Sequence, residues 1–173
     1  IGEIGIYLYW DKTFFEQQKV AFLRQVAWAQ ELSLPIVIHA RESTDIIIEL
    51  LEDFPAGTVR GIFHCFGGSL AQARRIFDLG FYLGIGGVVT FKKSGLDKTL
   101  ADIDLAHLVL ETDAPYLAPS PFRGKRNESA YLLQVAEKVA AIKGVSLAEV
   151  ARVTTANAAA VFTSAAVPTK RTE

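Results

Sequence analysis

The sequence is poor in sulfur-containing residues and in histidine. Its 173 residues include one cysteine, no methionine and three histidines. Because the lone Cys65 has no partner for an internal disulfide, we expect a reducing, cytoplasmic compartment. The chain starts with Ile1 inside an apolar run and has no methionine, so we also expect it to be truncated at its N-terminus.

Long apolar runs and a strong net charge are missing as well. The charge-free stretch Leu79–Phe91 is interrupted by glycines and is shorter than the about 20 apolar residues of a membrane span, so we expect no membrane partner. The formal net charge of -1 argues against nonspecific coating of nucleic acid, although a local basic patch remains compatible with it. Half of the residues are hydrophobic and the mean hydropathy is +0.25. This composition predicts the α/β class, in which strands are buried on both faces.

Short β-branched runs alternate with longer amphipathic stretches. The predicted strands are Ile1–Ile6, Ile36–His39, Gly61–Phe66, Phe81–Val88 and Leu108–Glu111. Helices are predicted from Thr13 to about Leu32, from Ser69 to Gly80, and over Ala130–Lys143 and Leu147–Phe162. Capping boxes mark three of these starts, in the pairs Thr13 with Glu16, Ser69 with Gln72 and Ser146 with Glu149. The alternation predicts a parallel sheet in one domain, residues 1–162, followed by a disordered tail, residues 163–173.

Ionisable side chains lie in or directly after four of the predicted strands. These residues are Glu3, His39, His64 and Asp113. They converge if the strands are parallel, because the carboxyl ends of the strands then meet on one face. Two imidazoles and two carboxylates suit a divalent metal ion, although each residue alone also fits a structural role. The third histidine, His107, precedes its strand, so we expect a structural role for it at the opposite end.

Five longer motifs lie along the chain: Gly2-Glu3-Ile4-Gly5, Leu34-Pro35-Ile36-Val37-Ile38-His39, His64-Cys65-Phe66, Glu111-Thr112-Asp113-Ala114-Pro115-Tyr116-Leu117-Ala118-Pro119 and Arg123-Gly124-Lys125-Arg126-Asn127. From Ile1 to about Phe162, their order and spacing resemble those of TatD-type metal-dependent deoxyribonucleases, which have an amidohydrolase-like TIM barrel fold. It implies that Glu3, His39, His64 and Asp113 are metal ligands for one or two divalent ions, with magnesium, manganese and zinc not distinguished. It also implies phosphodiester hydrolysis of DNA, single-stranded or at ends, with Asp113 and Glu3 in catalytic roles.

The sequence departs from this family in two places. The His-x-His pair that opens the family's barrel is absent, so the chain resembles only about the last five βα units of a (β/α)8 barrel. We therefore expect the chain as written to be metal-poor and inactive, and the catalytic interpretation requires an upstream segment with the pair. Tyr7 also stands where the family has an acid after its GEIG motif, which affects the hydrogen bonding expected around Glu3.

Loops after the strands supply candidate substrate contacts. Arg123, Lys125 and Arg126, with Asn127, suit backbone phosphates, and a solvated charged loop is the alternative. Lys92 and Lys93 give a weaker signal of the same kind and fit a surface role better.

Tyr9, Trp10 and Cys65 each allow a structural and a functional interpretation. Tyr9 and Trp10 suit stacking on a base, but packing of the barrel rim is favoured. Cys65 is expected to be a buried strand residue and not a nucleophile.

Two other functions remain open from the sequence. One is metal-dependent hydrolysis of another bond, such as a lactone, an amide or an aminoacyl ester, since folds of this kind host many reactions. The other is a catalytically inactive remnant that binds nucleic acid or protein. The oligomeric state is left open.

Overall fold

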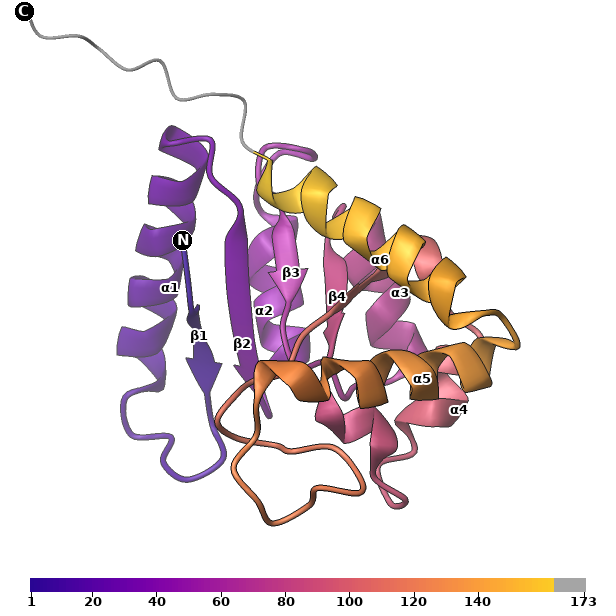
Figure 1. The fold of residues 1–173 in the computed structure, drawn as a ribbon. Coiled ribbons are helices and arrows are strands. Elements are labelled where there is room, and N and C mark those ends of the chain that lie inside the picture. Colours follow the sequence, from indigo (N-terminus) through magenta and orange to yellow (C-terminus); the bar gives the residue numbers. More distant parts are fainter. Residues whose placement is uncertain (164–173) are drawn as a thin grey trace, which may run out of the picture.

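Five short strands alternate with helices along the chain. The computed structural model describes residues 1–163, so all but the first residue of the predicted tail lie outside the described residues. The strands are β1 (Ile4–Tyr7), β2 (Ile36–Arg41), β3 (Gly61–Phe63), β4 (Tyr82–Ile85) and β5 (Leu108–Leu110). They form one parallel sheet in the order β1-β2-β3-β4-β5, and Figure 1 labels the first four of these strands. The predicted parallel α/β sheet is confirmed.

The helices follow the strands in turn. They are α1 (Phe15–Glu31), α2 (Thr44–Glu52), α3 (Leu70–Asp78), α4 (Leu96–Ala101), α5 (Leu132–Lys143) and α6 (Leu147–Phe162), with 3-10 turns η1 (Gly87–Thr90), η2 (Leu105–His107) and η3 (Ser129–Tyr131). Within residues 1–163, none of these helices combines the length and the apolarity that crossing a membrane requires.

The two faces of the sheet differ in what they carry. Successive side chains of a strand point to opposite faces, so alternate residues share a face. On the outer face, Ile38, Phe63 and Leu83 belong to the main core and are at most 1% exposed. This core also contains residues of α1, α2, α3 and α5, such as Phe22, Ile47, Ile76 and Val139.

The inner face has a much smaller apolar cluster. Ile62 of β3 and Val109 of β5 pack there against Val161 near the end of α6. Towards the carboxyl ends of the strands, the same face carries polar residues, because Glu3, His39 and His64 alternate with outer-face core residues. The inner face therefore has an apolar amino end and an ionisable carboxyl end.

The helix starts follow the sequence in some cases and not in others. Ser69 forms the predicted capping box with Gln72, and Gly80 follows the end of α3 with a φ of 80°. Ser146 caps α6 by accepting from the backbone N–H of Glu149. The box predicted at Thr13 is wrong: its N–H instead donates to Asp11, and α1 begins at Phe15 without a side-chain cap.

The strand ends also differ from the predictions. β2 continues to Arg41, so His39 lies inside the strand. β3 stops at Phe63 because Cys65 adopts a left-handed conformation, with a φ of 48°. β4 stops at Ile85, and the predicted strand residues after it form η1. The N-terminal residue stays beside β2, since the carbonyl of Ile1 accepts from the N–H of Val37 at 3.0 Å.

The C-terminal helices lie as predicted. α6 has the predicted bounds, and α5 begins two residues after the predicted start because η3 precedes it. His107 also has the expected structural role, since its ring stacks on Phe77 of α3 with centroids 4.1 Å apart. It lies ahead of β5, at the amino edge of the sheet.

Candidate metal centre

Three of the four predicted ligands meet at the carboxyl end of the inner face. Glu3 comes just before β1, His39 comes from β2, and His64 directly follows β3. His39 Nδ1 and His64 Nε2 are 3.1 Å apart, and Glu3 Oε2 lies 3.4 Å from the first nitrogen and 3.5 Å from the second. The sequence spacing therefore identified a cluster that the fold assembles.

The spacing of these three atoms fits a divalent cation. Metal–ligand bonds to histidine and carboxylate are about 2.0–2.2 Å, so two ligands on one ion lie roughly 3.0–3.5 Å apart at octahedral or tetrahedral angles. The distances of 3.1–3.5 Å among Glu3, His39 and His64 lie in that range. Two bare imidazole lone pairs at 3.1 Å would repel, so either a proton or a cation is needed between them.

Glu111 orients His64 from the other side of its ring. Its Oε2 lies 3.2 Å from His64 Nδ1, and its Oε1 accepts from the backbone N–H of Cys65 at 2.6 Å. A proton on Nδ1 that is donated to Glu111 leaves the Nε2 lone pair free to face Glu3 and His39. Burial alone would lower the pKa of His64, but the hydrogen bond to Glu111 and the nearby carboxylates outweigh burial and raise it.

Glu111 was predicted as the last residue of a strand and as part of the Glu-Thr-Asp motif, with no role of its own. The available signal was that Glu111 directly follows a buried strand, where the carboxyl ends meet. Its partner could not be read from the sequence, because the contact with His64 spans 47 positions and depends on strand register.

Two glycines, one in β4 and one in the loop that follows it, leave space for the Glu111 side chain. A Cβ at Gly84 would lie 3.2 Å from the Glu111 carboxylate, and one at Gly86 would lie 3.4 Å from it.

His39 is held differently from His64. The ring of Tyr7 stacks on the His39 imidazole, with centroids 5.8 Å apart and planes 20° apart. Burial lowers the pKa of His39, and the neighbouring His64 lowers it further. A lowered pKa keeps the imidazole neutral, which is the form that binds a metal. Tyr7 thus braces His39 through its ring at the position where an acid was expected.

Asp113 does not share the point where the other three donors converge. It lies beyond β5 with a φ of 55°, within range of the charges of His64, Glu111 and Glu3. Burial raises the pKa of its carboxyl above the usual value, and the charges of Glu111 and Glu3 act in the same direction. Such a group is a stronger base than a free carboxylate. The geometry therefore leaves Asp113 outside the converging group of Glu3, His39 and His64.

Cys65 follows His64 but offers no nucleophile. Burial raises the pKa of its thiol to about 12, and the charges of Glu111 and Asp113 contribute to the rise. A thiol with such a pKa is protonated at neutral pH. This agrees with the expectation that Cys65 is no nucleophile, but the residue is half-buried and lies just beyond β3, not within it.

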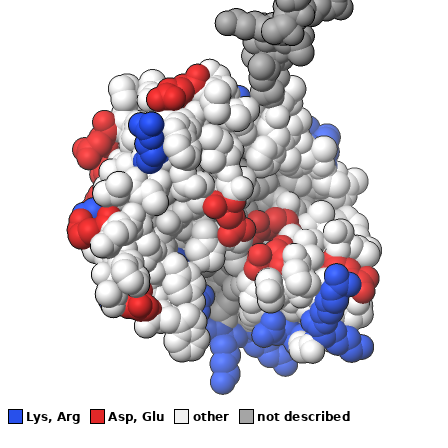
Figure 2. Space-filling view, turned by 90° about the vertical axis from the view of Figure 1, so that its left-hand side faces the viewer, with Lys and Arg blue, Asp and Glu red and all other residues white. Residues whose placement is uncertain are grey.

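The basic residues gather where two loops meet near the carboxyl ends of the strands. The Arg123 guanidinium lies 3.6 Å above the Phe91 ring, and the Ser120 N–H donates to Thr90 at 2.8 Å. These contacts bring the loop with Arg123, Lys125 and Arg126 next to Lys92 and Lys93. We refer to these five residues together as the basic patch. Figure 2 shows acidic side chains near the middle of one face and lysine and arginine side chains along its lower edge.

Asn127 is not part of this patch. It is 2% exposed, and its side-chain amide donates to the carbonyls of Thr112 and Tyr116 at 2.6 and 2.7 Å. Its side-chain oxygen accepts from the N–H of Glu128. Since its polar atoms are taken by backbone, the structure corrects the phosphate-binding role expected for Asn127: the residue braces the loop after β5.

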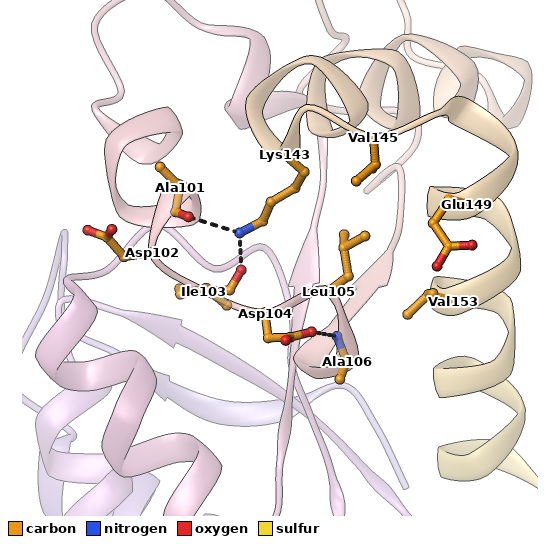
Figure 3. Close-up of a pocket in the computed structure, with 10 residues that line it drawn as sticks. All are labelled: Ala101, Asp102, Ile103, Asp104, Leu105, Ala106, Lys143, Val145, Glu149 and Val153. Carbon is orange, nitrogen blue, oxygen red and sulfur yellow. Dashed lines mark hydrogen bonds between the residues drawn. The ribbon is translucent and has the colours of Figure 1, made fainter.

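A cavity of about 670 Å³ lies at the opposite, amino edge of the sheet (Figure 3). Lys143 at the end of α5 points into it and donates to the carbonyls of Ala101 and Ile103, which lie at and just beyond the end of α4. Asp104 accepts from the N–H of Ala106. These polar groups are engaged with backbone, so the cavity has a structural character and the inner-face cluster is the better candidate site.

Comparison with known proteins supports the fold. A sequence model described as TatD related DNase matches residues 1–163. An uncharacterized metal-dependent hydrolase of Bacillus subtilis, YabD, is 44% identical over 163 residues, which cover 94% of this chain and 64% of that protein. The 3'-5' ssDNA/RNA exonuclease TatD of Klebsiella pneumoniae is 35% identical over 150 residues, which cover 83% of this chain and 57% of the exonuclease.

A solved structure confirms the expected fold class. The TatD homologue YJJV of Escherichia coli superimposes with a TM-score of 0.87 at 30% identity, over 94% of this chain and 63% of that one. The chain thus spans somewhat less than two thirds of the length of these relatives. Because the family model covers nearly the whole chain, this protein belongs to the TatD-related DNase family.

Proposed function

We propose that the chain carries the metal-binding part of a hydrolase that cleaves phosphodiester bonds in single-stranded nucleic acid. The observation that carries this proposal is the convergence of Glu3, His39 and His64 at 3.1–3.5 Å. Two relatives support it by their names, since one is called a metal-dependent hydrolase and another an ssDNA/RNA exonuclease.

The residues divide the work according to their surroundings. Glu3 Oε2, His39 Nδ1 and His64 Nε2 are the atoms that would hold a divalent cation such as magnesium, manganese or zinc. A cation held there would supply Lewis-acid activation of water and of a phosphoryl oxygen. Glu111 keeps the His64 ring in the tautomer that presents Nε2, and Tyr7 limits rotation of the His39 ring.

Asp113 takes the proton of the attacking water in this proposal. Its pKa is raised by burial, so it accepts a proton more readily than an exposed aspartate does. The left-handed backbone conformation at Asp113 turns the chain sharply after β5. Strained conformations of this kind are typical of functional sites.

The basic patch binds the phosphates on either side of the scissile bond. Lys125 and Arg126 are exposed, while Arg123 is steadied by its contact with Phe91. Contacts to backbone phosphates position a strand without reading its sequence. Three expectations from the sequence stay predictions. They are the cytoplasmic location, the set of four ligands that includes Asp113, and the boundary of the domain at residue 162.

A hydrolysis assay with three substrates tests the function. In this proposal the three converging donors hold one cation without the missing His-x-His pair. Fluorescently labelled single-stranded DNA should therefore be cut in the presence of magnesium or manganese, cutting should stop with chelator, and it should return when the metal is added back. A phosphodiester such as bis(p-nitrophenyl) phosphate should also be cleaved, and an ester without phosphorus should not be. Cleavage of a lactone or carboxylic ester alone would reassign the substrate, and DNA binding without any cleavage would support an inactive binding remnant.

A further inference from the structure

Two neighbouring aromatic rings project from the loop after β1. Trp10 is 81% exposed and Tyr9 is 43% exposed, so the structure corrects the expectation that they pack the barrel rim. Their rings meet edge to face, with centroids 4.5 Å apart and planes 83° apart. The contact between the two rings holds them together while leaving most of the indole open to solvent.

A positive charge completes this group. The Arg41 guanidinium lies 4.7 Å from the centre of the Tyr9 ring, within the range of a cation–π contact. The backbone fixes the pair, because the N–H of Leu8 donates to the carbonyl of Arg41 at 3.0 Å. We refer to Tyr9, Trp10 and Arg41 as the aromatic platform.

The aromatic platform lies next to the candidate metal centre. Arg41 is two positions after His39 at the end of β2, and Tyr9 is two positions after Tyr7, whose ring stacks on His39. An exposed indole, a phenol and a guanidinium thus border the site on the side opposite the loop that follows β5.

This combination matches the chemistry of an unpaired nucleotide. Aromatic side chains bind the π-faces of bases with little sequence preference, and an arginine beside them reaches the backbone phosphate. In a duplex the faces of the bases are covered by stacking, whereas an unpaired base exposes them. The aromatic platform therefore favours a single strand over a duplex.

We propose that Trp10 stacks on an unpaired nucleobase, beside a phosphate bound by Arg41, and so holds a single strand across the metal centre. This inference rests on the proposed function and extends it by assigning the base-binding subsite. The side chain of Trp10 contacts the base directly, while Tyr9 sets the angle of the indole and the distance of Arg41 from it.

Tryptophan fluorescence provides a direct test, because the chain has only two tryptophans. The second, Trp28 on α1, is 42% exposed and lies under Arg24 at 5.5 Å, which makes it a matched control outside the site. The chain with Trp28→Phe reports on Trp10 alone, and the chain with Trp10→Phe reports on Trp28 alone. Both variants should also carry Asp113→Asn, so that the DNA probe is bound and not cut. The titrations are done with magnesium present, and a gel should show that the probe stays intact.

A short oligothymidylate should quench the fluorescence of Trp10 and leave that of Trp28 unchanged. An abasic oligonucleotide of equal length, which keeps the phosphates and lacks the bases, should not quench Trp10. Trp10→Ala should raise the dissociation constant for oligothymidylate about 5- to 100-fold, Trp10→Phe should restore much of the affinity, and Trp28→Ala should change it by less than about twofold.

The outcomes separate this inference from the proposed function. If the parent chain cuts labelled single-stranded DNA while Trp10→Ala changes neither affinity nor cleavage, the stacking subsite is wrong and the hydrolase proposal stands. If oligothymidylate and the abasic probe bind equally well and quench equally, Trp10 does not contact bases. If the parent chain neither binds nor cuts the DNA, both proposals are overturned.

Discussion

The outer and inner faces of the sheet use the same strands for different purposes. On the outer face, Ile38 and Leu83 are fully buried in the main core that the helices cover. On the inner face, the neighbouring His39 and Glu3 stay partly exposed and face one another. Because alternate residues of a strand point to opposite faces, each strand contributes to stability and to chemistry at once. Substitutions on the two faces should therefore separate these two properties.

The largest expected effect is on activity and comes from Asp113→Asn. Loss of a positioned general base costs about 10²- to 10⁴-fold in rate. The side chain is near-isosteric and lies outside the core, so the free energy of unfolding should stay within about 0.5 kcal/mol of the parent value. Steady-state hydrolysis of labelled single-stranded DNA and thermal unfolding measure the two quantities. A rate near that of the parent would remove Asp113 from the proposed mechanism.

A matched pair of isoleucines compares the two faces in stability. Ile38→Ala on the outer face removes a fully buried side chain from the main core, and we expect a loss of about 3–5 kcal/mol in the free energy of unfolding. Ile62→Ala on the inner face disrupts only the small cluster with Val109 and Val161, and about 2 kcal/mol is expected. Urea unfolding followed by circular dichroism compares them. Equal losses would show that the inner cluster packs as tightly as the main core.

Glu111→Gln tests whether the inner face depends on support around its ligands. The amide can still accept from the Cys65 N–H, but it loses the charge that stabilises the His64 imidazole. Changing a group that orients a metal-binding histidine typically weakens metal affinity by about 10- to 100-fold. Titration calorimetry with manganese measures this effect. Unchanged affinity would mean that Glu111 is needed only for the backbone after β3.

The smallest expected effect concerns the space around Glu111. A Cβ at Gly84 would lie 3.0 Å from His64 Cα and 3.2 Å from the Glu111 carboxylate, so Gly84→Ala should displace one of them. We expect a loss of about 1–2 kcal/mol in stability and weaker manganese binding. Gly67→Ala is the control, because a Cβ there meets nothing within 4 Å. Equal behaviour of the two variants would show that β4 adjusts without strain.

The sequence predicted the parts of the fold that local patterns determine. The parallel strands, the Ser69 cap and the bounds of α6 follow from β-branched runs, capping chemistry and helical periodicity. The capping box predicted at Thr13 is wrong because Asp11 offers the Thr13 N–H a nearer acceptor. Cys65 ends β3 early and Asp113 turns the loop after β5, because both adopt a left-handed conformation that no local pattern indicated.

The candidate site was predictable only in outline. Histidines and acids near strand ends indicated that Glu3, His39 and His64 converge. The roles of Glu111 and Asn127 were not predictable, because each depends on contacts between segments far apart in sequence. The exposure of Trp10 was missed for a related reason, since an aromatic residue after a strand fits packing and binding equally well until its neighbours are known.

Metal titration tests the central claim most directly. The inner face should bind one manganese ion per chain through Glu3, His39 and His64, and the joint substitution of both histidines by alanine should abolish binding while leaving the main core folded. Isothermal titration calorimetry of the parent chain and the His39→Ala, His64→Ala variant, each checked by circular dichroism, gives the answer. Equal manganese affinity in the two folded proteins, or no binding by the parent, would contradict the account.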